Sequence, residues 1–207
     1  MATYQLHCFG ESGNAYKAAL MLALSGADWE PVHVRFFDGE TRSAAFRRDV
    51  NGMGEVPVLV HGDIKIAQSA VILEYLAEQT GRFGPRDAAE RREILSWLFF
   101  DNHKFTAYTA TLRFLHGLMG EENEVTAWLR GRAASAWKVV DTHLATRTFM
   151  VGERASIADI SLAGYIYYPE ATGIDRAKFP AIAAWAERVK ALPGWKHPYD
   201  LMARAKA

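Results

Sequence analysis

Apolar and polar positions in residues 1–80 follow two different periods in turn. The runs 4–9 and 30–36 predict strands, whereas residues 14–24 carry apolar side chains at helical spacing. A strand, a helix and a strand in this order predict a βαβ unit with parallel strands and a right-handed crossover. Residues 41–50 are polar and weakly helical.

The pattern changes twice between residues 54 and 77. Residues 56–60 form a β-rich run, and residues 64–66 can return as a second strand after a turn. From Ser69 onward the apolar positions recur at helical spacing behind a serine N-cap. The predicted order is therefore β-α-β-α-β-β-α, a compact α/β domain over residues 1–80.

Pro57 is unusual inside a predicted strand. Proline has no amide to donate, so it implies an edge strand or a special geometry such as a cis Val56–Pro57 bond. The backbone of Val56 would then be free to pair with an extended ligand. The exposed amides at the start of the helix that begins at Ser69 would bind an anion. These features predict a receptor for a small anionic peptide. The alternative is a plain hairpin followed by a core helix.

The second half of the chain has a different composition. A Gly/Pro-rich linker occupies residues 81–85, and no convincing strand follows Asp87. Long helical patterns predict an all-helical bundle over residues 87–207; they cover 88–118, 124–144, 156–168 and 180–192. Ser156 and Asp159 have the spacing of a capping box, which we interpret as a folding element.

Charge and cysteine content exclude several classes of function. The 24 basic residues balance 24 acidic ones, which gives no reason to expect nucleic acid or an anionic membrane as a partner. Cys8 is the single cysteine, so an internal disulfide framework and a CxxC redox pair are excluded. No metal site is expected. The N-terminus lacks a basic segment followed by a long apolar run, so we expect a cytoplasmic protein.

Three motifs in order resemble the glutathione S-transferase family: Asn51–Leu59, Gln68–Leu76 and Ser156–Asp159. The resemblance covers nearly the whole chain. It implies a thioredoxin-like α/β N-terminal domain and an all-α helical-bundle C-terminal domain, with glutathione as co-substrate. Family members hold glutathione through the backbone of the residue before a cis-proline, here Val56 before Pro57. They also use an acidic residue and a serine at the third helix.

Ser69 matches that serine, whereas Gln68 replaces the more usual Glu. Gln68 can still accept a hydrogen bond from the ligand's ammonium group, but without charge assistance. The resemblance therefore implies weaker affinity or a slightly different ligand. Gly52 is a further departure, because proline is usual at this position.

The family activates the glutathione thiol with a Tyr, Ser, Cys or Asn near the first helix. Residues 12–17 resemble the Thr-Pro-Asn-x-x-Lys signature of nu-type bacterial members, with Ser12 for Thr and Asn14 for Asn. In an alignment with beta-type members, Asn14 falls where their cysteine lies. A free thiol has a pKa of about 8.5, and either side chain could lower it together with the helix amides. The choice between Ser12 and Asn14 stays open, as does a plain N-cap and turn. Cys8 is expected to be buried and inert.

Four further residues are implied by the resemblance. His103 and Lys104 resemble a pair in beta-type members that approaches the sulfur and the glycine end. Tyr108 would lie in the bundle core or in an apolar co-substrate pocket. Arg42 lies where some relatives bind the glycine carboxylate. Solvent-exposed side chains are the alternative for the three basic residues.

The leading hypothesis is an enzyme that conjugates the glutathione thiolate to small hydrophobic electrophiles. The second is a glutathione-dependent disulfide or peroxide reductase, which the Ser-x-Asn sequence at Ser12 favours. The third is a non-catalytic binding module, because fold resemblance alone does not establish activity. Relatives are usually homodimers, so the resemblance also implies a homodimer.

Overall fold

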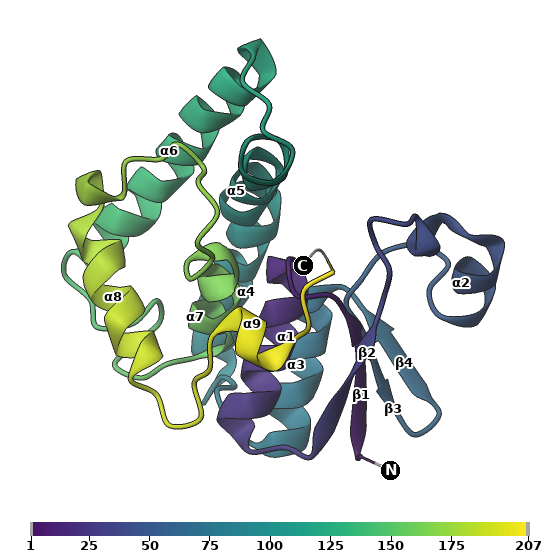
Figure 1. Cartoon of the computed structure of the whole chain (residues 1–207). Helices are drawn as coiled ribbons and strands as arrows, with labels where there is room; N and C mark the ends of the chain where they lie inside the picture. The colour runs from purple at the N-terminus through teal and green to yellow at the C-terminus, as the bar shows by residue number, and fades with distance from the viewer. Residues whose placement is uncertain (1, 206–207) are drawn as a thin grey trace. The chain divides into compact units, whose positions relative to one another are not determined.

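The computed structural model describes residues 2–205, and the described chain divides into two compact units (Figure 1). The first unit contains the residues up to Gly84 together with those from Leu192 onward. The second unit spans Pro85–Ala191.

The first unit is built on a four-stranded mixed sheet with the order β2-β1-β3-β4. Its strands are β1 (Tyr4–Cys8), β2 (Trp29–His33), β3 (Val58–His61) and β4 (Ile64–Ala67). β1 and β2 are parallel, while β3 is antiparallel to both β1 and β4. The predicted βαβ unit and the returning strand are both confirmed.

Three helices accompany this sheet: α1 (Gly13–Ser25), α2 (Ala44–Asp49) and α3 (Ser69–Thr80). A short 3-10 turn, η1 (Glu40–Arg42), precedes α2. α1 and α3 pack against each other, and they contact β1 and β3 respectively (Figure 1). Leu6 of β1, Leu20 of α1 and Ile72 of α3 are fully buried. Burying such a side chain stabilises the fold by about 1.5–3 kcal/mol, which favours this helix-on-sheet arrangement.

The last described residues pack with the first unit rather than with the helical one. Tyr16 donates its hydroxyl hydrogen to the carbonyl of Lys196 at 2.9 Å, and the amide of Gly10 donates to the carbonyl of Ala203 at 2.7 Å. A Cβ at Gly10 would lie only 2.7 Å from that carbonyl oxygen, so glycine allows this close approach. The short helix α9 (Pro198–Leu201) belongs to this segment.

The sequence places the second domain over residues 87–207, whereas contacts in the structure group the residues from Leu192 onward with the first unit. The segment from Leu192 onward contacts the first unit through a few long-range backbone bonds. Hydrogen bonds between residues far apart in the sequence do not appear in the hydrophobic pattern. The pattern of apolar positions therefore predicts this segment as part of the helical bundle.

The regular elements of the second unit are all helices among its described residues, as the sequence predicts. Its α-helices are α4 (Ala88–Phe100), α5 (Thr106–Leu112), α6 (Glu124–Leu144), α7 (Ile157–Leu162) and α8 (Pro180–Lys190). Short 3-10 turns occur at η4 (Ala163–Tyr165) and η5 (Arg176–Lys178). α4 begins at the N-cap Asp87, which accepts hydrogen bonds from the amides of Ala89 and Glu90, both at 2.8 Å. In the described part of the chain, no helix is both long and apolar enough to cross a bilayer.

Two π-helical segments interrupt the helical pattern predicted over residues 88–118. They are η2 (Asp101–Phe105) and η3 (Arg113–Leu118), and each begins with a buried charged residue. Asp101 accepts hydrogen bonds from Thr106 and Ser161. Arg113 pairs with Glu170 at 2.7 Å. Because a π turn inserts one extra residue, it rotates the following side chains around the helix axis.

The predicted capping box at the start of α7 is present. Ser156 accepts a hydrogen bond from the amide of Ala158, and Asp159 accepts one from the amide of Ser156 at 2.9 Å. Asp159 also accepts from the amide of Met150 at 2.8 Å and from the indole of Trp185 at 2.9 Å. Burial raises the pKa of this carboxyl, and the donated hydrogen bonds oppose that rise. The aspartate therefore links the helix start to α8 and to the preceding loop.

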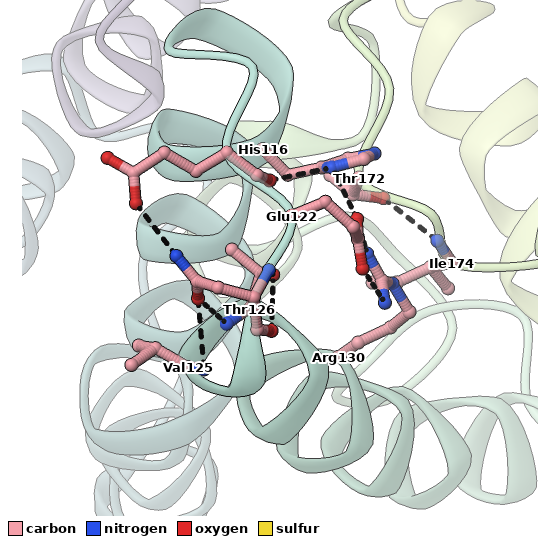
Figure 2. Close-up of polar contacts among 9 residues, drawn as sticks. His116, Glu122, Val125, Thr126, Arg130, Thr172 and Ile174 are labelled. Carbon is pink, nitrogen blue, oxygen red and sulfur yellow. Dashed lines mark hydrogen bonds and ion pairs between the residues drawn. The ribbon is translucent and has the colours of Figure 1, made fainter.

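A second capping box starts α6 (Figure 2). Asn123 accepts hydrogen bonds from the amides of Val125 and Thr126, and the hydroxyl of Thr126 accepts one from the amide of Asn123 at 2.9 Å. Beside it, the carboxylate of Glu122 lies 2.8 Å from Arg130 and 3.0 Å from His116. The hydrogen bond from Arg130 lowers the pKa of Glu122. These contacts fix the connection between η3 and α6.

Candidate active site

The strand register brings three separate segments to one edge of the sheet. His7 lies opposite Val58, and Val58 lies opposite Ala67 on its other side. The end of β1, the start of β3 and the end of β4 therefore meet at the same edge (Figure 1). The residues just beyond these strand ends include most of the predicted site: Ser12, Asn14, Val56, Pro57, Gln68 and Ser69.

Val56 and Pro57 lie immediately before β3, and the bond between them is cis, as predicted. In the part of the chain that the structure describes, neither the amide nor the carbonyl of Val56 has a hydrogen-bond partner. The preceding loop is held by Asn51, whose side-chain amide donates to the carbonyl of Glu55 at 2.9 Å. The backbone of Val56 is thus fixed in place with its polar groups available.

Gly54 allows the loop before Val56 to turn. Its φ is 71°, a left-handed conformation that favours glycine. A Cβ here would lie 2.8 Å from the carbonyl oxygen of Thr41. The loop can therefore approach the segment before α2 only with glycine at this position.

Gln68 and Ser69 form the start of α3. Gln68 has a φ of 69°, although it is not glycine. This positive φ turns the backbone from the end of β4 into α3. No side chain caps α3, and the amides of Ser69, Ala70 and Val71 lack hydrogen-bond partners among the described residues. Ser69 is only 6% exposed. Free amides at a helix N-terminus bind anions through their partial positive charge.

Ser12 and Asn14 lie at the start of α1. Ser12 is the N-cap, because its Oγ accepts a hydrogen bond from the amide of Ala15 at 3.1 Å. The hydroxyl hydrogen remains available for donation. Asn14 is half-buried, and its Oδ1 is buried without a hydrogen-bond partner. The amides of Gly13 and Asn14 also have no partner within the described chain.

Cys8 is placed as the sequence predicts. It lies in β1, is 2% exposed, and burial raises the pKa of its thiol to about 12. A thiol with this pKa is almost fully protonated at neutral pH. Cys8 therefore cannot supply the thiolate for a reaction at this edge.

Sequence reasoning missed Glu11 and Glu55 near this edge. Glu11 is 3% exposed and precedes Ser12, and its carboxylate accepts a hydrogen bond from the amide of Ala205 at 2.9 Å. Glu55 accepts a hydrogen bond from the side chain of Gln68 at 3.0 Å. No periodic pattern or motif marks either residue as part of the site. Each makes its hydrogen bond only in the folded chain, so the sequence gives no signal for it.

The remaining predicted residues lie elsewhere. Arg42 ends η1 in the first unit and is exposed. His103 and Lys104 fall within the π-helical segment η2, and Tyr108 lies in α5, all in the second unit. The hydroxyl of Tyr108 accepts a hydrogen bond from Arg132 at 3.1 Å. Among the described residues, no group of three or more His, Cys, Asp or Glu side chains is arranged to hold a metal ion.

Family models match both halves of the chain. The model for the glutathione S-transferase N-terminal domain matches residues 3–78, and the model for the C-terminal domain matches residues 101–193. The chain is 30% identical to glutathione S-transferase F14 of Arabidopsis thaliana, over 96% of this chain and 86% of that protein. It is 28% identical to the disulfide-bond oxidoreductase YghU of Escherichia coli, over 93% of this chain and 72% of that protein.

Solved structures agree with this assignment. A glutathione S-transferase from Pseudomonas fluorescens Pf-5 superimposes with a TM-score of 0.90 at 32% identity, covering 95% of this chain and 99% of that one. A glutathione transferase from Burkholderia graminis, solved with two glutathione molecules per subunit, gives a TM-score of 0.81 at 25% identity, covering 93% and 85%. The fold is thus a thioredoxin-like α/β unit followed by a helical unit. The chain belongs to the glutathione S-transferase family.

Proposed function

We propose that this protein binds glutathione and transfers its thiolate to small hydrophobic electrophiles. The observation that carries the proposal is the arrangement at the sheet edge. The backbone groups of Val56 are available there beside the free amides of α3. An extended peptide with a carboxylate at one end matches this pair of features.

In this proposal, the backbone of Val56 pairs with the cysteinyl residue of glutathione. The γ-glutamyl carboxylate binds the first amides of α3 and the hydroxyl of Ser69, and Gln68 accepts from the adjacent ammonium group. Arg42 would bind the glycine carboxylate. His103, Lys104 and Tyr108 are proposed as further substrate contacts, and alanine substitution at each tests that role through KM.

The sulfur would be activated at the start of α1. The hydroxyl of Ser12, the side-chain amide of Asn14 and the free helix amides can donate hydrogen bonds to a thiolate, which lowers the thiol pKa. The thiol proton passes to solvent. The thiolate then attacks an electrophilic carbon, so that a carbon–sulfur bond forms as the bond to the leaving group breaks.

The reaction class is tested with glutathione and 1-chloro-2,4-dinitrobenzene, from which conjugation releases chloride. We expect saturable turnover that depends on both substrates. Turnover no faster than the uncatalysed reaction would contradict conjugation of this class of electrophile.

Glutathione-dependent disulfide reduction is the second candidate. The 28% identity to the Escherichia coli disulfide-bond oxidoreductase favours it, together with the Ser-x-Asn sequence at Ser12. Cys8 is protonated and buried, so both reducing thiols would come from glutathione. Two glutathione molecules would then give one glutathione disulfide and two substrate thiols. Reduction of hydroxyethyl disulfide separates this reaction from conjugation, and glutathione binding without either activity would indicate a non-catalytic module.

We also propose that the protein is a cytoplasmic homodimer. Among its described residues, the first unit exposes the large apolar side chains of Met53, Ile64 and Val71. Covering such side chains favours association. Sedimentation equilibrium should give twice the chain mass of 23.1 kDa, whereas the mass of one chain would contradict the dimer.

A further inference from the structure

The side chain of Gln68 is held by a neighbouring carboxylate. Its Nε2 donates to Oε2 of Glu55 at 3.0 Å and lies 3.4 Å from the sulfur of Met53. An ionised carboxylate can only accept hydrogen bonds, so the amide nitrogen of Gln68 must be the atom that faces Glu55. The carbonyl Oε1 of Gln68 therefore remains available to accept a hydrogen bond from a ligand.

Glu55 brings a negative charge to the start of α3, and the guanidinium of Arg47 lies close to its neighbour Gly54. Among the described residues Glu55 forms no ion pair, and its carboxylate has Gln68 as its hydrogen-bond partner. Two basic side chains of the same unit are used elsewhere. Arg47 donates to the carbonyl of Gly52 at 3.1 Å, and Lys65 donates to the carbonyl of Asp49 at 2.6 Å. The charge of Glu55 is therefore open to a cationic group from outside the chain.

We propose that Glu55 and Gln68 together bind the α-ammonium group of a γ-glutamyl ligand. This inference rests on the proposed function, because it takes the α-carboxylate of that ligand to lie at the amides of α3. The ammonium and the carboxylate share one carbon atom, so a ligand held at Ser69 brings its ammonium beside the preceding residue. Oε1 of Gln68 accepts the hydrogen bond, and Glu55 supplies the negative charge that Gln68 lacks.

This arrangement selects a class of ligand. A free α-amino acid end group offers a carboxylate to the helix amides and an ammonium to the Glu55–Gln68 pair. A ligand without the ammonium loses the charge-assisted contact and brings only its carboxylate toward Glu55, which repels it. Glu55 is thus a specificity-determining residue for peptides with a free γ-glutamyl end.

The test is calorimetric titration with two ligands that differ only in the ammonium group. Glutathione carries it, whereas glutaryl-cysteinylglycine keeps the carboxylate and lacks it. We expect Glu55→Gln to weaken glutathione binding about fivefold, the upper range for an exposed ion pair. The same substitution should leave the affinity for glutaryl-cysteinylglycine unchanged or raise it. The matched control is Glu78→Gln, which removes an exposed negative charge from α3 and should change neither affinity.

A double variant that exchanges the side chains of residues 55 and 68 provides a second test. The double variant Glu55→Gln/Gln68→Glu keeps one charge and one amide at the same two positions, so it should bind glutathione as tightly as the unaltered protein. The role of Glu55 would be overturned if Glu55→Gln lowered the affinity for both ligands equally. It would also be overturned if Glu55→Gln lowered the affinity for glutathione no more than Glu78→Gln does. If the unaltered protein bound neither ligand, the proposed function would fail and this inference with it.

Discussion

The surroundings of single residues determine which polar groups are available at the sheet edge. Cys8, Ser12 and Asn14 lie within a few positions of one another, yet only the last two offer polar groups at the start of α1. Cys8 lies inside β1, where burial raises the pKa of its thiol to about 12. The same short segment therefore holds one inert group and two hydrogen-bond donors.

The inert thiol gives the first prediction. At pH 8, Cys8 should not react with iodoacetamide in the native protein, because both its burial and its raised pKa suppress the thiolate. It should react at an ordinary rate in guanidinium. Mass spectrometry of the alkylated chain measures both rates, and Cys8→Ala should retain full turnover. Rapid labelling of the native chain would contradict this account.

The second prediction concerns Asn14. If the protein conjugates glutathione as proposed, Asn14→Ala should lower turnover about tenfold or more, since it removes a donor from the proposed position of the thiolate. The fold should persist, because the Ser12 cap and its bond to Ala15 do not involve the Asn14 side chain. Turnover and melting temperature are measured together. Unchanged turnover would remove Asn14 from the mechanism and leave Ser12 as the candidate.

At the scale of the helices, caps and buried charges determine where each element begins. α4 and α6 start with an acid or amide that accepts two amide hydrogen bonds, and α7 starts with a reciprocal box. Only the box at Ser156 and Asp159 is predicted from the sequence. The box at Ser156 precedes a clear apolar run and contains the usual acidic partner. The box at Asn123 pairs an amide with the hydroxyl of Thr126, so it lacks that acidic residue.

The third prediction compares two substitutions in one cap. Ser156→Ala should lower the free energy of unfolding by about 1 kcal/mol, the usual cost of a lost N-cap. Asp159→Ala should cost several-fold more, about 3 kcal/mol, because it leaves the buried donors of Met150, Ser156 and Trp185 unsatisfied. Urea unfolding measures both. Equal losses would mean that Asp159 acts only as a cap partner.

The fourth prediction is a pH dependence at the start of α4. Hydrogen bonds from the amides of Glu90 and Ala89 lower the pKa of Asp87 below its ordinary value of 3.8. A lowered folded-state pKa contributes stability above the unfolded pKa, and that contribution is lost as the pH falls through the folded pKa.

Asp87→Asn keeps a capping oxygen but cannot titrate. We therefore expect the stability advantage of the unaltered protein over Asp87→Asn to shrink when the pH is lowered from 6 to below about 3. Melting temperatures of the two proteins across this range measure the difference. A constant difference would mean that Asp87 does not carry the effect.

At the scale of the whole molecule, the sequence predicts most of the architecture. Each strand of the first unit and the helical character of the second are visible as periodicity, and Val56, Pro57 and Ser69 are visible as motif residues. The π-helical segments are not visible, because Asp101 and Arg113 are charged residues whose burial depends on partners far along the chain. The packing of residues after Leu192 and the Glu55–Gln68 bond depend on the fold in the same way.

Glutathione binding tests the central claim most directly. A ligand that binds only the folded chain stabilises it by mass action, about 2.7 kcal/mol at a concentration of one hundred times Kd. Millimolar glutathione should therefore raise the melting temperature by several degrees, and cysteinylglycine, which lacks the γ-glutamyl group, should raise it much less. Ser69→Ala should reduce the shift. The absence of any rise in melting temperature with glutathione at up to about 10 mM would contradict the account, because a ligand that binds the folded chain must stabilise it by mass action.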